Sequence, residues 1–363
     1  MDCITLYFAM LATEIPLHVY DMPKNNHVFS TIYALIATTS VPFSSAEAIA
    51  AQSKPGEAAE KVCAIYPHLK DSYWLSVNYG MVMEAEKQNI NLKVFESGGY
   101  PNVDKQRSQL VACRDWGADA IILGTVSPTA FSNDLSQYTK DTPVFATVNH
   151  LVADKAQESH IKGVVGVDWY WMGYKVGEFL AKKHPKGSGT VDIAFLPGPQ
   201  SSGGTKPVIL GFLQAIKGSD VNVMKTLWAD NDKELQRNLI QEVIENYPAL
   251  DYIVGSAVAI EAAISELRNN EAREDIELLS IYLSHGVYRG LLRGKVELAP
   301  TDKMVEQGKL SVQQAVSYLR GQAYQPDLAP KIEVLSPKAL DESVVAESLS
   351  PSAYRPIFSV EAD

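Results

Sequence analysis

Val62-Cys-Ala-Ile-Tyr66, Pro67-His-Leu-Lys-Asp-Ser72 and Tyr73-Trp74 follow one another in this chain as an apolar run, a polar turn and an aromatic pair. The apolar run has the length of a buried strand, and the aromatic pair opens a segment with apolar residues at helical spacing. In open α/β sheets, ligands lie outside the carboxyl ends of the strands. The stretch therefore predicts a strand–turn–helix unit that delivers two aromatic side chains to a small-molecule site.

This strand–helix unit recurs along most of the chain. Predicted strands and helices alternate as far as 277–281, and the pattern restarts after Val167. Alternation of this length indicates parallel sheets with helices on both faces. We expect an α/β fold of two doubly wound parallel-sheet lobes, joined by crossing segments because no low-complexity linker separates them.

Composition narrows the class of protein. The 363 residues are 46% hydrophobic and 21% charged, which is enough for two domains of ordinary globular composition. The net charge of −11 argues against nucleic acid or an anionic membrane as the partner. Beyond residue 50 no run approaches the roughly 20 apolar residues of a membrane span, so none is expected in the mature chain.

Residues 1–48 have the features of a leader with a secretory signal peptide. A weakly basic start at Met22 precedes an apolar segment over 28–43, and Ala46-Glu-Ala48 is a pattern that signal peptidase accepts. Translation is expected to begin at Met22 and cleavage to follow Ala48. The alternative is a buried core helix, although the segment lacks an amphipathic period. In a bacterium with an outer membrane, export would place the protein in the periplasm.

Two cysteines remain after the leader, which carries Cys3, is removed. Cys63 lies at the start of the first strand, and Cys113 lies near the end of the helix that leads to the third strand. Both positions fall at the same edge of a doubly wound sheet. A disulfide fits an oxidising compartment, while two buried free thiols are an equal alternative.

Several motifs together resemble the type I periplasmic binding proteins of the ribose- and galactose-binding group, over residues 62–335. The matching landmarks are Asp71-Ser-Tyr-Trp74, Glu84-Ala-Glu86 followed by Leu92-Lys-Val-Phe95, Gly117-Ala-Asp-Ala-Ile-Ile122, Val167-Asp-Trp-Tyr-Trp-Met-Gly173, Gly211-Phe-Leu-Gln-Ala-Ile216 and Gly308-Lys-Leu. The resemblance implies two lobes, three crossing segments and a ligand cleft between the lobes.

The same resemblance implies domain boundaries. The implied segments are 62–167 plus 303–327 for the N-terminal lobe, 168–302 plus 328–345 for the C-terminal lobe, and 346–363 for an irregular tail. The crossings would fall near Val167, Thr301–Asp302 and Asp327.

Departures from the family pattern point to an unusual ligand. Sugar-binding members hold hydroxyl groups with Asn, Asp and Arg side chains at the cleft. By the resemblance, the position of a sugar-binding Arg falls on His150, and that of an Asp falls on Tyr282. A site that leaves buried polar groups of a polyol unpaired loses several kcal/mol of affinity.

An aromatic cage is the predicted replacement. The expected ligand-binding residues are Asp71, Tyr73, Trp74, Tyr100, Trp169 and Tyr282, with His150 and Asp302 as further candidates. Aromatic faces attract cations, and quaternary ammonium groups fit best because they have no N–H to satisfy. Packing in the core is the alternative for each ring. The residues therefore predict a site for a small methylated amine.

The motif set most resembles members of the family that bind trimethylamine N-oxide and work with a membrane sensor histidine kinase. That resemblance implies the same ligand and, as partner, the periplasmic domain of such a kinase in a two-component system. The alternative is a solute-binding component of an ABC importer for a methylated amine or modified sugar. No phosphate loop, metal-binding cluster or nucleophile elbow occurs in the sequence, so no enzyme activity, metal or cofactor is expected.

Overall fold

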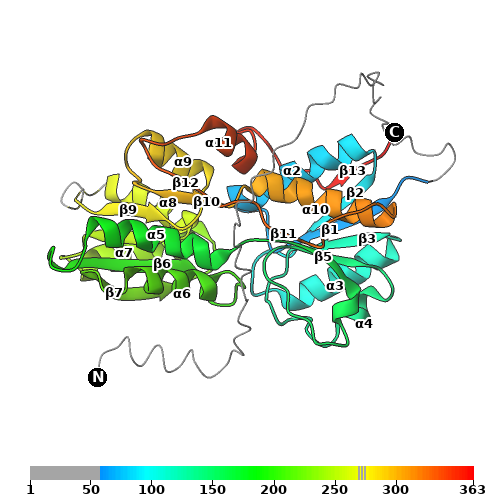
Figure 1. Cartoon of the computed structure of the whole chain (residues 1–363), viewed down its shortest axis with the longest axis horizontal. Helices are drawn as coiled ribbons and strands as arrows, with labels where there is room; N and C mark the ends of the chain where they lie inside the picture. The colour runs from blue at the N-terminus through cyan, green and yellow to red at the C-terminus, as the bar shows by residue number, and fades with distance from the viewer. Residues whose placement is uncertain (1–57, 269, 271–272, 274) are drawn as a thin grey trace, which may run out of the picture. The chain divides into compact units, whose positions relative to one another are not determined.

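The computed structural model describes residues 58–268, 270, 273 and 275–363, the coloured part of Figure 1. The expected leader, with its start at Met22 and its cleavage after Ala48, lies outside these residues.

The first lobe contains a seven-stranded sheet with the order β11-β5-β4-β3-β1-β2-β13. All its strand pairs are parallel except β13 with β2. The first pass of the chain supplies β1 (Lys61–Tyr66), α2 (Ser72–Gln88), β2 (Asn91–Glu96), α3 (Val103–Asp115), β3 (Ala120–Leu123), α4 (Leu135–Thr139), β4 (Val144–Val148), a 3₁₀ turn (Glu158–His160) and β5 (Ile161–Gly166). Residues 62–66 are fully buried, as expected for a central strand covered on both faces.

The second lobe contains a four-stranded parallel sheet with the order β7-β6-β8-β9. Its elements are α5 (Trp169–Lys183), β6 (Val191–Gly198), α6 (Thr205–Ile216), β7 (Val221–Trp228), α7 (Lys233–Asn246), β8 (Tyr252–Gly255), α8 (Ala257–Arg268), β9 (Glu277–Ser280) and α9 (His285–Leu292). The alternation of strands and helices confirms the predicted α/β class, and Figure 1 shows the two sheets in separate lobes, each with its own helices.

The last part of the chain, residues 299–363, passes between the two lobes. It forms β10 (Ala299–Thr301), α10 (Met304–Leu319), β11 (Asp327–Leu328), β12 (Glu333–Leu335), α11 (Glu342–Ser348) and β13 (Ser359–Val360). Strands β11 and β13 join the first sheet, whereas β10 and β12 pair with each other. The chain therefore changes lobes after β5, between β10 and α10, between β11 and β12, and a fourth time before β13.

The tail differs from the irregular extension predicted for residues 346–363. Its last strand, β13, forms one edge of the first sheet and pairs with β2 (Figure 1), and the side chain of Asn78 on α2 binds the chain just before it. Asn78 Nδ2 donates to the carbonyl oxygen of Ile357 at 3.0 Å, and Asn78 Oδ1 accepts from the Ile357 backbone N–H at 3.1 Å. A two-residue strand is too short to show a period in the sequence, so this fourth passage was not predicted.

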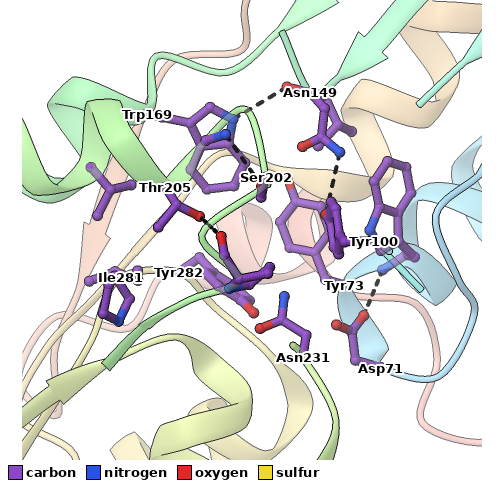
Figure 2. Close-up of a pocket in the computed structure, with 16 residues that line it drawn as sticks. Asp71, Tyr73, Tyr100, Asn149, Trp169, Ser202, Thr205, Asn231, Ile281 and Tyr282 are labelled. Carbon is purple, nitrogen blue, oxygen red and sulfur yellow. Dashed lines mark hydrogen bonds between the residues drawn. The ribbon is translucent and has the colours of Figure 1, made fainter. Parts of the chain in front are cut away.

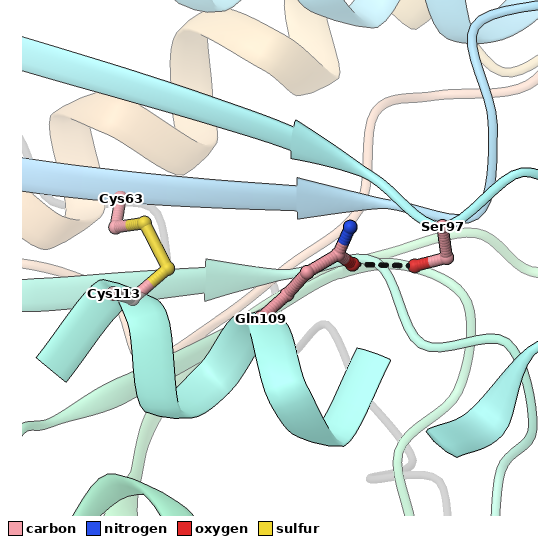
Figure 3. Close-up of a disulfide and its surroundings, with 4 residues drawn as sticks. All are labelled: Cys63, Ser97, Gln109 and Cys113. Atoms are coloured by element: carbon pink, nitrogen blue, oxygen red, sulfur yellow. Dashed lines mark hydrogen bonds between the residues drawn. A yellow bond between two sulfur atoms is a disulfide. The ribbon is translucent and has the colours of Figure 1, made fainter. Parts of the chain in front are cut away.

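A disulfide joins Cys63 on β1 to Cys113 on α3, as Figure 3 shows. The two Cα atoms are 5.7 Å apart, inside the 7 Å limit for a bridge. Of the two alternatives that the sequence left open, the structure has the bridge. It ties the first strand to the helix that covers it, in the lobe that supplies the Asp71–Trp74 turn.

Candidate ligand-binding site

The turn after β1 is fixed by a helix cap. The carboxylate of Asp71 accepts a hydrogen bond from the backbone N–H of Trp74 at 3.2 Å and caps the N-terminus of α2. This cap places Tyr73 and Trp74 in the first helical turn, where both side chains are buried. The two aromatic side chains of the motif are therefore held in place by a capped helix rather than carried on a loop.

Three aromatic rings from three different elements meet at one point. The ring centroid of Tyr73, on α2, lies 5.3 Å from that of Tyr282, just after β9, and 6.2 Å from that of Trp169, on α5. Trp169 and Tyr282 are 6.4 Å apart. Tyr73 belongs to the first lobe and the other two to the second, so the cluster forms only where the lobes meet.

The cluster borders a small cavity of about 40 Å³ (Figure 2). One water needs roughly 10–15 Å³ by the same measure, so the space suits a compact molecule of a few heavy atoms. Its walls are Asp71, Tyr73, Trp74, Tyr100, Val148, Asn149, Trp169, Pro197, Pro199, Ser202, Gly204, Thr205, Val208, Asn231, Ile281 and Tyr282. All six principal residues predicted from the sequence thus face one cavity.

Asp302 lies behind the aromatic wall rather than in it. The hydroxyl of Tyr73 donates to the Asp302 carboxylate, which also accepts from Gln307 Nε2 at 2.8 Å. Burial raises the pKa of Asp302 above its usual range, and burial raises that of Tyr73 well above its usual value. Asp302 therefore positions the Tyr73 ring and does not itself border the cavity.

The hydroxyl of Tyr282 is buried and has no hydrogen-bond partner among the described residues. Burial raises its pKa well above the usual value, so the group stays a neutral O–H donor. A second unpaired atom, Oδ1 of Asn231, belongs to another residue of the same wall. Buried polar groups are normally paired, so the wall keeps unused hydrogen-bonding capacity.

His150, expected as a further ligand-binding candidate, does not border the cavity. Its side chain is exposed, and the preceding residue, Asn149, borders the cavity in its place. The reason lies in Val148, whose φ of 63° interrupts the alternation of side chains at the end of β4. Asn149 Nδ2 donates to the Thr125 carbonyl at 2.8 Å and to the Tyr100 hydroxyl at 3.3 Å.

Four polar wall residues were not predicted: Asn149, Ser202, Thr205 and Asn231. Ser202 and Asn231 follow β6 and β7, at the carboxyl ends of strands where ligands of this fold class lie. The same rule, applied to every strand of the second lobe, would have indicated Ser202 and Asn231 as candidates.

No helix among the described residues is long and apolar enough to cross a membrane. Within the same part of the chain, no group of three or more His, Cys, Asp or Glu side chains is arranged to hold a metal ion.

Comparison with known proteins gives a matching family and several relatives. A model of the family described as periplasmic binding proteins and sugar binding domain of LacI family matches residues 59–355. The periplasmic protein TorT of Escherichia coli K12 is 44% identical over 301 residues, which cover 83% of this chain and 84% of TorT.

Solved structures agree with that match. Crystal structures of a TorS sensor domain–TorT complex, without ligand and in the presence of TMAO, each hold a chain 62% identical to this one. Each alignment covers 82% of this chain and 99% of the other, with a TM-score of 0.78. An ABC transporter solute binding protein from Bradyrhizobium sp. BTAi1, with bound bis-tris, is 34% identical with a TM-score of 0.68, covering 83% of this chain and 89% of that one.

Proposed function

This chain belongs to the family of periplasmic binding proteins and LacI-type sugar binding domains, and we propose that it binds trimethylamine N-oxide and signals to a membrane histidine kinase. Its location is periplasmic, like that of the TorT relatives. The observation that carries the proposal is the small cavity bordered by aromatic rings of both lobes. The TorT chains crystallised with a TorS sensor domain, one of them in the presence of TMAO, support both ligand and partner.

The chemistry of the wall matches the two halves of this ligand. A trimethylated N⁺ is attracted by aromatic faces at about 0.5–2 kcal/mol per contact when desolvated. The N-oxide oxygen needs a donor, and we assign that role to the hydroxyl of Tyr282, a residue of the cavity wall whose O–H has no partner among the described residues. Because no reacting group is required for this recognition, we propose binding without turnover.

Ligand binding would favour the closed arrangement of the lobes. Tyr73 comes from one lobe and Trp169 and Tyr282 come from the other, so only the closed form completes the cage. A partner that prefers one lobe arrangement then responds to the ligand. Linkage requires that the partner tighten ligand binding by the same factor by which ligand tightens the partner.

Trp169→Ala tests the cage directly. The substitution should weaken binding of trimethylamine N-oxide roughly tenfold or more, because it removes about 1–2 kcal/mol of cation–π attraction as well as buried contact area. Isothermal titration calorimetry measures the change. Trp171→Ala is the matched control, since Trp171 lies on the same helix, is 44% exposed and does not border the cavity.

Two outcomes would contradict the cage. Equal affinity of Trp169→Ala and the unchanged protein would assign Trp169 to packing alone. Ribose binding as tightly as the amine oxide would mean that the site recognises hydroxyl groups.

Tyr282→Phe separates ligand recognition from folding. Affinity for trimethylamine N-oxide should fall about tenfold, because a hydrogen bond to a charged oxygen contributes roughly 1.5–3 kcal/mol. Stability of the ligand-free protein should stay the same or rise by about 1 kcal/mol, because the hydroxyl has no partner to lose.

Tyr73→Phe is the contrasting variant for this prediction. Its hydroxyl donates to buried Asp302, so its loss should lower the free energy of unfolding by about 1–3 kcal/mol. Calorimetry and urea unfolding measure the two effects. A Tyr282→Phe protein with full affinity would remove Tyr282 as the donor.

An importer component is the second candidate function, favoured by the Bradyrhizobium relative, an ABC transporter solute binding protein with a bound amine buffer. Pull-down with the periplasmic domain of the cognate sensor kinase, with and without trimethylamine N-oxide, distinguishes the two. Capture of the kinase domain supports the sensor function. Capture of a permease instead would support the importer.

A further inference from the structure

A second cavity, of about 350 Å³, lies in the second lobe between α8 and α9. Its apolar lining is Ile264, Leu267, Ile276 and Leu278, and its charged lining is Arg268, Arg289, Arg293, Lys295 and Glu261. We call this the basic pocket. It shares no residue with the aromatic cavity.

The charge of the basic pocket is opposite to that of the chain. Four cations and one carboxylate border it, whereas the whole protein carries a net charge of −11. Nearby, Arg237 pairs with Glu266 and Arg273 pairs with Asp275. Within the described residues, by contrast, none of the four pocket cations forms an ion pair or a side-chain hydrogen bond, and all four are exposed.

The floor of the basic pocket is suited to an apolar anchor. Leu267, Ile276 and Leu278 are at least 93% buried, yet they border an open space wide enough for a side chain. Such a cavity, surrounded by cations, fits a segment with carboxylates around one aliphatic or aromatic residue.

The basic pocket adjoins a cavity that both lobes line. Glu261, Gly286 and Arg289 also line a third cavity, whose other walls include Lys70, Asp71 and Ser72 of the first lobe. At the start of α9, the backbone N–H of His285 donates to Ser72 Oγ at 3.1 Å. Residues 281 and 282, at the aromatic cavity, lie just before this helix.

We propose that the basic pocket is a docking site for an acidic segment of the sensor kinase's periplasmic domain, with an apolar side chain of that segment in the cavity. This inference rests on the proposed partnership with a kinase. Opening the lobes would separate Ser72 from His285 and change the rim at Arg289. A segment seated there would therefore respond to the ligand-bound arrangement of the lobes.

A charge reversal tests the docking site. Arg289→Glu/Arg293→Glu, in the mature protein saturated with trimethylamine N-oxide, should bind the kinase's periplasmic domain at least about tenfold more weakly at low salt. The difference from the unchanged protein should shrink as salt rises. Surface plasmon resonance at two salt concentrations gives both values, and Arg289→Lys/Arg293→Lys should retain most of the binding.

The matched control is Lys217→Glu/Lys225→Glu, which makes the same charge change elsewhere on the second lobe. Neither lysine borders the basic pocket, so this variant should bind normally. Ser265→Trp fills the cavity from its exposed wall while keeping all four cations, and it should also weaken docking.

The outcomes separate this inference from the ligand proposal. Calorimetry of each variant alone should give unchanged affinity for trimethylamine N-oxide, since none of the substituted residues borders the aromatic cavity. Equal weakening by the two charge reversals, or none by either, would overturn the docking site. A second result would also overturn it: the Arg289→Glu/Arg293→Glu protein binds the kinase domain normally but no longer binds vesicles containing phosphatidylglycerol. That result would assign the cations to a membrane surface. Absence of kinase binding by the unchanged protein, with normal ligand binding, would remove the partner and this site but keep the ligand.

Discussion

Gly173→Ala should lower the free energy of unfolding by about 3 kcal/mol or more, because two helices of the second lobe touch through their backbones at this glycine. A Cβ on Gly173, in α5, would lie 2.0 Å from the carbonyl oxygen of Val208, in α6. The contact is mutual, since a Cβ on Gly211 would lie 1.9 Å from the carbonyl oxygen of Tyr170. No side-chain rotation relieves a clash with backbone, so the helices must separate.

The separation should also reach the ligand site. Helix α5 begins with Trp169, and α6 carries Thr205 and Val208, all of which border the aromatic cavity. Any Gly173→Ala protein that folds should therefore bind trimethylamine N-oxide more weakly than the unchanged protein.

Urea unfolding followed by circular dichroism measures the stability change. If Gly173→Ala is too unstable for this measurement, a loss of folded protein on purification shows the same effect. Gly166→Ala is the control, because a Cβ there would meet only Val164 Cγ1, at an ordinary 3.6 Å. It should leave stability nearly unchanged. A Gly173→Ala protein as stable as this control would contradict the close helix contact.

The first lobe contains the same kind of close helix contact through glycines. A Cβ on Gly80, in α2, would lie 2.0 Å from the Val305 carbonyl oxygen, and one on Gly308, in α10, would lie 2.2 Å from that of Val77. In each lobe, then, the helix that brings an aromatic residue to the cavity, Tyr73 on α2 or Trp169 on α5, packs against its neighbour through glycines. Gly211 and Gly308 stood in the sequence as landmarks of the family; the structure gives their physical reason.

Long periodic segments made much of the fold predictable. The central strands of both sheets are continuous apolar runs, such as 62–66 and 252–255, because they are buried on both faces. The aromatic wall was predictable for a related reason: Trp169 and Tyr282 lie just beyond strands and Trp74 lies in the first turn of the helix after β1, at the sheet ends where ligands of this fold class bind.

Features that depend on one backbone angle or on long-range pairing were not predictable. The positive φ of Val148 places Asn149, rather than His150, at the cavity. A single sequence gives no period that reveals such a bend. The buried contact between Tyr73 and Asp302 joins residues 229 positions apart, so the supporting role of Asp302 required the fold. Strands β11 and β13 have two residues each and take their register from strands already formed.

Cys63→Ala/Cys113→Ala should lower the free energy of unfolding by roughly 4 kcal/mol, because the bridge closes a loop with a sequence separation of 50. In the chain-entropy account, the bridge acts mainly on the unfolded state, which loses freedom when the loop is closed. Both cysteines are fully buried, so a small packing loss adds to the effect. Urea unfolding of the oxidised protein, the reduced protein and the double variant measures it.

Reductant separates the effect of the bridge from that of packing. Reductant should lower the urea-unfolding midpoint of the unchanged protein most of the way to that of the double variant. The midpoint of the double variant itself should not change. In the native state, affinity for trimethylamine N-oxide should change little, because neither cysteine borders the aromatic cavity. Two cysteines in the exported protein that react with iodoacetamide after denaturation without reductant would contradict the bridge. Such a result would favour the alternative of two buried thiols in the core of the first lobe.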